Sequence, residues 1–170
     1  MVEHAATPGI VAREQLLADD ETARVAGLPV TTPVRTAHDL GRYLPRRQAV
    51  ARLDALMRAT PFSTEDVLLL AERYPAARGI RRLRSVLHLV DGGAASPKET
   101  WLRLLLIDAG LPTLTTQIPV VDRYRVLAML DITIRVIAED TAEDVIERVR
   151  RALLARGWRP ERTATFPWAG

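Results

Sequence analysis

The sequence predicts an α+β protein in which a mainly helical N-terminal region is followed by a small β-sheet flanked by helices. Three observations lead to this class. Before residue 91, apolar residues recur at helical spacing in several segments that carry capping signals. Two later runs, 113–121 and 125–138, have the β-branched composition of strands. Helix-like segments precede and follow those two runs, at 96–110 and 141–157.

Bulk composition excludes several functional classes. With 170 residues, 48% of them hydrophobic and 26% charged, the chain is an ordinary globular sequence. It has no run of the ~18–20 apolar residues that a membrane helix requires, and its N-terminus lacks the features of a signal peptide. We therefore expect a cytoplasmic protein with no membrane partner. Because there is no cysteine and only three histidines, no metal site is predicted.

Four helical segments are expected before residue 91. The clearest start is Thr32, a capping residue followed by Pro33 at the first helical position. His38, in the first helix, is expected to face solvent and pair with a neighbouring arginine. The preceding stretch, residues 4–26, leaves strand, short helix and turn all open. The expected helices cover 33–43, 46–59, 63–74 and 80–90.

The basic side chains are almost all arginine, and Lys98 is the sole lysine. A guanidinium group can bind two phosphate oxygens at once. In the segment 80–90 the arginines lie opposite an apolar stripe, which is the electrostatic footprint of phosphate contact and also the pattern of an ordinary solvated helix face. A GC-rich genome, which favours arginine codons, would also produce this composition. The candidate DNA-binding residues are Arg46, Arg47, Arg78, Arg81, Arg82 and Arg84.

The second half of the chain has a linker, two capped helices and a lone acidic residue. Ser96, Pro97 and Glu99 form a capping-box sequence, so the structural role of Glu99 is to close the helix start. Thr141 caps the last helix. Asp131 stands alone in the long apolar run between them. The glycine-rich linker at 91–95 marks the predicted boundary between a helical region, 1–90, and a second domain, 91–157. A loose tail, 158–170, is expected after the second domain.

Several of these motifs, taken in order, resemble a known family. They are GLPVTTPVRTAHDL, an arginine-rich helix, SPKETWLRLLLIDAGLP, a strand reaching LD, and RVIAED before DVIERVRRAL. The order is similar to that of actinobacterial proteins in which an AbiEi-type (type IV toxin–antitoxin) region precedes a nuclease domain. That domain is like the very-short-patch-repair (Vsr) endonucleases of the restriction-endonuclease-like fold. The resemblance covers residues 3–157 and implies catalytic counterparts at Glu99 and Asp131.

The resemblance also implies that part of the nuclease domain is missing. In the family, a second strand with a glutamate and an aspartate follows the position of Asp131, whereas here the chain continues directly into Ile134 and Arg135. Nucleases of this kind hold Mg²⁺ with carboxylates from two adjacent strands. We therefore expect an incomplete restriction-endonuclease-like sheet and no resident cofactor, with Mg²⁺ bound only if residual nuclease activity survives. An exposed sheet edge would favour a homodimer.

Four functions remain open from the sequence. The leading hypothesis is a catalytically degenerate endonuclease-like protein that binds double-stranded DNA through its arginine-rich helix, with Glu99 and Asp131 as vestiges of the active site. The first alternative is an antitoxin-like regulatory module with a cognate protein partner. The second is a metal-dependent DNA endonuclease completed by dimerisation. The third is a decayed reading frame without function. We do not expect a single chain to be an enzyme.

Overall fold

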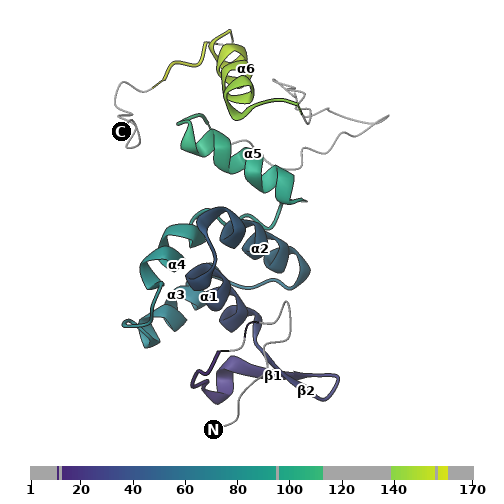
Figure 1. Ribbon diagram of the computed structural model, residues 1–170, viewed down its shortest axis with the longest axis vertical. Helices are drawn as coiled ribbons and strands as arrows, with labels where there is room; N and C mark the ends of the chain where they lie inside the picture. The colour runs from purple at the N-terminus through teal and green to yellow at the C-terminus, as the bar shows by residue number, and fades with distance from the viewer. Residues whose placement is uncertain (1–10, 12, 95, 113–138, 156, 161–170) are drawn as a thin grey trace, which may run out of the picture.

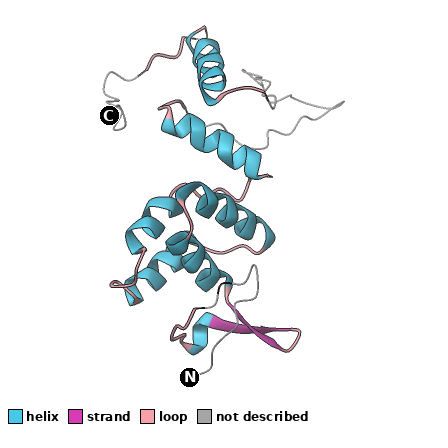
Figure 2. Cartoon of the chain, in the orientation of Figure 1, coloured by secondary structure: helices cyan, strands magenta, loops and turns pink. Residues whose placement is uncertain are grey.

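The computed structural model describes residues 11, 13–94, 96–112, 139–155 and 157–160 (Figure 1). The described part combines helices with a two-stranded antiparallel sheet, which confirms the α+β class (Figure 2). The predicted strands at 113–121 and 125–138, and Asp131 with them, lie outside these residues. The elements are η1 (Asp19–Glu21), β1 (Thr22–Val25), β2 (Leu28–Thr31), α1 (Pro33–Tyr43), α2 (Arg46–Ala59), α3 (Thr64–Arg73), α4 (Ile80–Leu87), α5 (Pro97–Asp108) and α6 (Ala142–Leu154).

A β-hairpin lies at the N-terminal end of the described fold (Figure 1). β1 and β2 pair antiparallel, with Thr22 opposite Thr31 and Val25 opposite Leu28. The two turn residues between them, Ala26 and Gly27, have φ values of 50° and 81°. A two-residue hairpin turn of type I′ requires positive φ at both positions, which glycine adopts without strain. The sequence left this stretch open because alanine is an uncommon residue at such a position.

The predicted helix starts are confirmed. Thr32 Oγ1 accepts a hydrogen bond from the backbone N–H of Arg35 at 3.3 Å, and α1 begins at Pro33. The cap of α3 is Ser63, and the cap of α6 is Thr141, whose partner Asp144 completes a capping box. The predicted end of the fourth helix was wrong by three residues. Beyond Leu87 the backbone makes hydrogen bonds three residues back instead of four, so the helix tightens into a turn.

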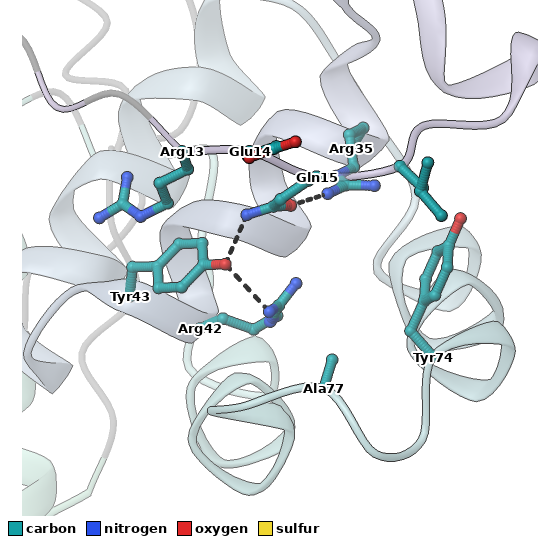
Figure 3. Close-up of a pocket in the computed structure, with 9 residues that line it drawn as sticks. Arg13, Glu14, Gln15, Arg35, Arg42, Tyr43, Tyr74 and Ala77 are labelled. Carbon is teal, nitrogen blue, oxygen red and sulfur yellow. Dashed lines mark hydrogen bonds between the residues drawn. The ribbon is translucent and has the colours of Figure 1, made fainter. Parts of the chain in front are cut away.

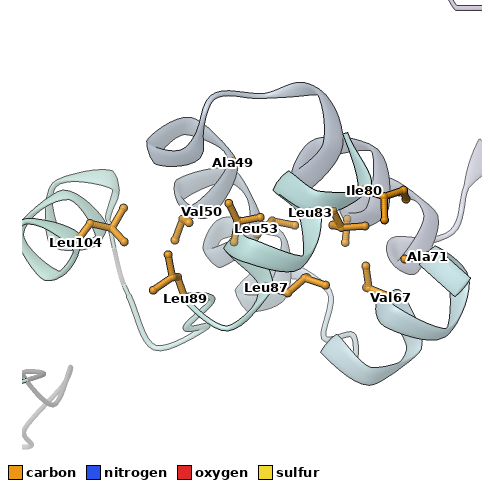
Figure 4. Packing of buried hydrophobic residues seen from close by; sticks show 12 residues of the cluster. Ala49, Val50, Leu53, Val67, Ala71, Ile80, Leu83, Leu87, Leu89 and Leu104 are labelled. Atoms are coloured by element: carbon orange, nitrogen blue, oxygen red, sulfur yellow. The ribbon is translucent and has the colours of Figure 1, made fainter. Parts of the chain in front are cut away.

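Helices α1 to α4 form a bundle around one apolar core (Figure 4). α1 and α4 approach closely at Gly41, where a Cβ atom would collide with the side chain of Leu83. The turn before α4 needs Gly79, which has φ +88° and whose Cβ would collide with the carbonyl oxygen of Arg42. The buried core residues are Ala37, Ala49, Val50, Leu53, Val67, Ala71, Ile80, Leu83, Val86, Leu87, Leu89 and Leu104.

α5 packs against α2, and α6 packs against α5. Leu104 of α5 belongs to the core of the bundle, and Arg46 at the start of α2 makes a two-pronged ion pair with Asp108 at the end of α5, with both N–O distances 2.8 Å. Val145 and Val149 of α6 belong to a second buried cluster that includes residues of α5. The domain boundary near residue 91 stays a prediction. No described helix is long and apolar enough to cross a membrane.

Candidate functional site

A pocket of about 600 Å³ opens where the extended segment 13–16 crosses α1 and the turn after α3 (Figure 3). This segment precedes the hairpin in the chain. α1 supplies Arg35, Arg42 and Tyr43 to the pocket. Most of the residues that line it are polar or aromatic. These are Arg13, Glu14, Gln15, Arg35, Arg42, Tyr43 and Tyr74.

Tyr43 is the centre of this pocket. Its hydroxyl oxygen accepts hydrogen bonds from Gln15 Nε2 at 2.6 Å and from Arg42 Nη2 at 3.1 Å. The guanidinium of Arg13 lies 4.1 Å from the centre of the Tyr43 ring, and that of Arg42 lies 4.8 Å from it. Both distances are within the range of a cation–π interaction. The hydroxyl group can also donate one hydrogen bond of its own.

Ion pairs with Glu21 and Asp39 hold Arg35 in place. Arg35 donates from Nε to Asp39 at 3.0 Å, from Nη1 to Glu21 and from Nη2 to Gln15. The buried carboxylate of Glu21 also accepts a hydrogen bond from the Tyr74 hydroxyl. Burial alone would raise the pKa of Glu21, but the hydrogen bonds from Tyr74 and Arg35 hold that pKa below its ordinary value. The guanidinium of Arg35 is therefore fixed beside an ionised carboxylate at neutral pH.

The pocket is rich in hydrogen-bond donors. Arg42 donates from Nε to the backbone oxygen of Arg78 at 2.9 Å, which ties α1 to the turn before α4. In the part of the chain that the structure describes, no group of three or more histidine, cysteine, aspartate or glutamate side chains is placed to hold a metal ion. Anchored guanidinium groups and tyrosine rings suit the binding of an acidic or carbonyl group.

His38 does not face solvent, so that prediction was wrong. Its side chain is fully buried, and its ring lies 6.2 Å from that of Tyr74. Neither ring nitrogen has a hydrogen-bond partner among the described residues, although Nδ1 is 3.4 Å from an oxygen of Asp39. The helical spacing of His38 with Arg35 and Arg42 was seen in the sequence, but α3 packs over this side of α1 and removes it from water.

The arginines predicted to bind DNA lie in two different environments. Arg78, Arg81, Arg82 and Arg84 are exposed on or beside α4, opposite its buried Leu83 and Val86. Arg47 is exposed at the start of α2. Arg46, by contrast, is engaged with Asp108 of α5. Exposed arginines thus gather on and beside α4, and Arg46 is directed elsewhere, while their role in binding DNA stays a prediction.

The two residues that the nuclease resemblance implies are not brought together in the described structure. Glu99 is exposed at the start of α5, where its backbone N–H donates to Ser96 Oγ at 3.2 Å and its Oε1 accepts from the same hydroxyl at 3.3 Å. This confirms its part in the helix start. Its catalytic role stays a prediction, and Asp131 lies outside the described residues.

Comparison with known proteins identifies the family. Residues 4–89 match the model of the AbiEi antitoxin C-terminal domain, and this is half of the chain. The chain therefore belongs to that family, and the AbiEi part of the predicted resemblance is confirmed. The match spans the pocket, the hairpin and the α1–α4 bundle. The Vsr-like endonuclease domain stays a prediction.

Two relatives come from Mycobacterium tuberculosis, and both are named as uncharacterized proteins. Each is 36% identical to this chain over 97 residues, which covers 57% of this chain and 36% of the relative. The chain thus spans about a third of the length of these relatives. No solved structure matches the chain.

Proposed function

We propose that this chain is an antitoxin-like regulatory module that acts in the cytoplasm and recognises a protein partner. The observation that carries the proposal is the family match over residues 4–89, which contains the arginine–tyrosine pocket. Arg35 and Arg42 are anchored by Glu21, Asp39 and the backbone of the α3–α4 turn. Side chains fixed before binding lose little conformational entropy when a partner docks. The pocket supports recognition of an acidic side chain or chain terminus.

Binding to the product of the adjacent gene tests this proposal. The two proteins are co-expressed, purified together and compared by isothermal titration calorimetry. Tyr43→Ala removes the ring that Arg13 and Arg42 contact, so we expect the complex to weaken at least ~10-fold, the effect of removing a buried aromatic anchor. Arg151→Ala, on the exposed side of α6, is the matched control and should bind normally. Absence of any complex would refute the proposal.

A second candidate function is binding of double-stranded DNA through the cationic face of α4. Its support is the exposure of Arg78, Arg81, Arg82 and Arg84 together, on a helix that has no acidic residue. Electrophoretic retardation of duplex DNA should weaken as salt rises. Arg81→Ala with Arg84→Ala should lower the salt slope by about two, roughly one for each arginine that no longer neutralises a phosphate. No retardation at low ionic strength would exclude this function, and Arg151→Ala is again the control.

The two nuclease hypotheses rest on the resemblance of residues 91–157 to the Vsr-like endonuclease domain. A degenerate endonuclease-like protein would show no cleavage of plasmid DNA with Mg²⁺. An endonuclease completed by dimerisation would show cleavage that Asp131→Ala abolishes, because Asp131 is the one strand carboxylate that the resemblance supplies. The same assay therefore separates the two.

A further inference from the structure

The side chain of Gln15 lies inside the arginine–tyrosine pocket (Figure 3). Its Oε1 accepts a hydrogen bond from Arg35 Nη2, and its Nε2 donates to the hydroxyl of Tyr43 at 2.6 Å. The same hydroxyl accepts a second hydrogen bond from Arg42 Nη2 at 3.1 Å. The carboxamide of Gln15 therefore already occupies polar groups that the pocket would offer to a ligand.

The segment that carries Gln15, residues 13–17, is lightly held and is called the strap below. It belongs to no helix or strand of the described structure, and four of its five residues are exposed, with Leu16 at 93%. Gln15 is the half-buried one. The strap also contacts α1 through Arg13, whose guanidinium lies over the ring of Tyr43. Segments with so little buried surface open at a low free-energy cost, so the strap can leave the pocket while the bundle stays folded.

The groups beneath the strap are held in position by residues outside it. Arg35 is 3% exposed and pairs with Glu21 and Asp39. Arg42 donates from Nε to the backbone oxygen of Arg78 at 2.9 Å. The two carboxylates are each shared between two guanidinium groups, which leaves part of the charge of those arginines available to a further anion. Removal of the strap would thus uncover donors that are already oriented for binding.

A carboxylate suits these donors better than the carboxamide that occupies them. One carboxylate oxygen can accept from Arg35 Nη2, as Oε1 of Gln15 does. The other oxygen can accept the hydrogen of the Tyr43 hydroxyl, whereas the nitrogen of a carboxamide only donates. A hydrogen bond with an ionised partner is roughly twice as strong as one between neutral groups. Because glutamate is isosteric with glutamine, the path that Gln15 takes into the pocket also fits a glutamate side chain.

We propose that Gln15 is a built-in competitor that fills the pocket until a glutamate side chain of the partner displaces it. This inference rests on the proposed function, because the glutamate belongs to the protein recognised there. Arg13 and Glu14 leave with the strap, so its displacement removes no net charge from the pocket. A tethered side chain competes at a millimolar effective concentration. The strap therefore excludes dilute free carboxylates and admits a glutamate that other contacts hold in place.

NMR spectroscopy of the full chain tests the proposal with sodium propionate, which carries the carboxylate of a glutamate side chain. The chain has three glutamines, Gln15, Gln48 and Gln117, and no asparagine, so three pairs of side-chain amide signals are expected. Gln15→Ala identifies the pair that belongs to Gln15. Propionate at about 100 mM, above the effective concentration of the strap, should move this pair toward the shifts of the exposed Gln48. Equal concentrations of propionamide or sodium chloride should leave it in place.

Variants separate displacement of the strap from other effects of propionate. Gln15→Ala removes the competitor, so propionate binding, followed by the backbone amide signals of α1, should tighten at least ~10-fold. Tyr43→Phe added to Gln15→Ala keeps the ring, removes the hydroxyl donor and should reverse this gain. Gln48→Ala is the matched control and should leave the affinity for propionate unchanged.

The proposal is overturned if propionate leaves the Gln15 signals in place, if propionamide moves them equally, or if Gln15→Ala does not tighten propionate binding. Calorimetry with the product of the adjacent gene separates this failure from failure of the proposed function. Gln15→Ala should strengthen that complex. A complex that forms with unchanged affinity would refute the strap and leave the proposed function standing.

Discussion

Replacing Asp54 by alanine is expected to loosen α5 from the bundle. Asp54 is 1% exposed and accepts three hydrogen bonds of 2.7 Å, from the backbone N–H of Asp91, from Thr100 Oγ1 and from Arg103 Nη2. Arg103 is 6% exposed and also donates from Nη1 to the backbone oxygen of Leu89 at 2.5 Å. These hydrogen bonds join α2, the segment after α4 and α5. Truncation of Asp54 leaves a buried guanidinium without its closest counter-charge.

The expected loss is about 3 kcal/mol in the free energy of unfolding, because breaking a buried ion pair by removing one partner costs roughly 3–5 kcal/mol. The lower end of this range applies because Arg103 keeps its hydrogen bond to the backbone oxygen of Leu89 and its Nε lies 3.9 Å from a carboxylate oxygen of Asp91. Asp54→Leu combined with Arg103→Met should recover most of the loss, since well-packed apolar residues often replace a buried ion pair at little cost.

Urea unfolding followed by far-UV circular dichroism measures these differences. Asp108→Asn is the matched control, because its ion pair with Arg46 is partly exposed and should contribute less than ~1 kcal/mol. A loss below about 1 kcal/mol for Asp54→Ala would show that the buried pair does not hold α5 in place. A double variant less stable than the single variant would contradict the same reasoning.

Four further predictions concern stability. The pKa of Glu21 is lowered in the folded protein, so its ionised form stabilises the fold above about pH 4.3, and this contribution disappears as the pH falls through the folded-state pKa. Glu21→Gln should therefore make the melting temperature depend less on pH on the acid side of the profile. Gly79→Ala should cost more than ~1 kcal/mol in urea unfolding, because of its positive φ and the collision with Arg42. His38→Leu should raise the free energy of unfolding by about 1 kcal/mol, since it removes a buried ring whose nitrogens have no hydrogen-bond partner among the described residues, while the 3.4 Å contact of Nδ1 with Asp39 is lost. Mg²⁺ at millimolar concentration should leave the melting temperature unchanged, whereas a working nuclease site would raise it.

Local signals made the helices predictable. A capping residue followed by proline marks the starts of α1 and α5, and the structure places both starts where Thr32 and Ser96 indicate. The end of α4 was less predictable because the apolar spacing continues through Leu89 and Val90, although their backbone N–H groups already donate three residues back instead of four. The hairpin was left open because its turn has only one glycine. Local chemistry fixes where an element begins more firmly than where it ends.

The pocket depends on interactions that periodicity does not reveal. Gln15 reaches Tyr43 across 28 positions of the chain, and no local pattern predicts that hydrogen bond. One signal was nevertheless present in the sequence. Arg35 and Arg42 have Asp39 within a turn of α1 and are buried beside it, whereas α4 contains three arginines and no acid, and these remain exposed. In α1 a carboxylate at helical spacing therefore accompanies the buried arginines, whereas in α6 Glu147 stands four residues before Arg151, which remains exposed.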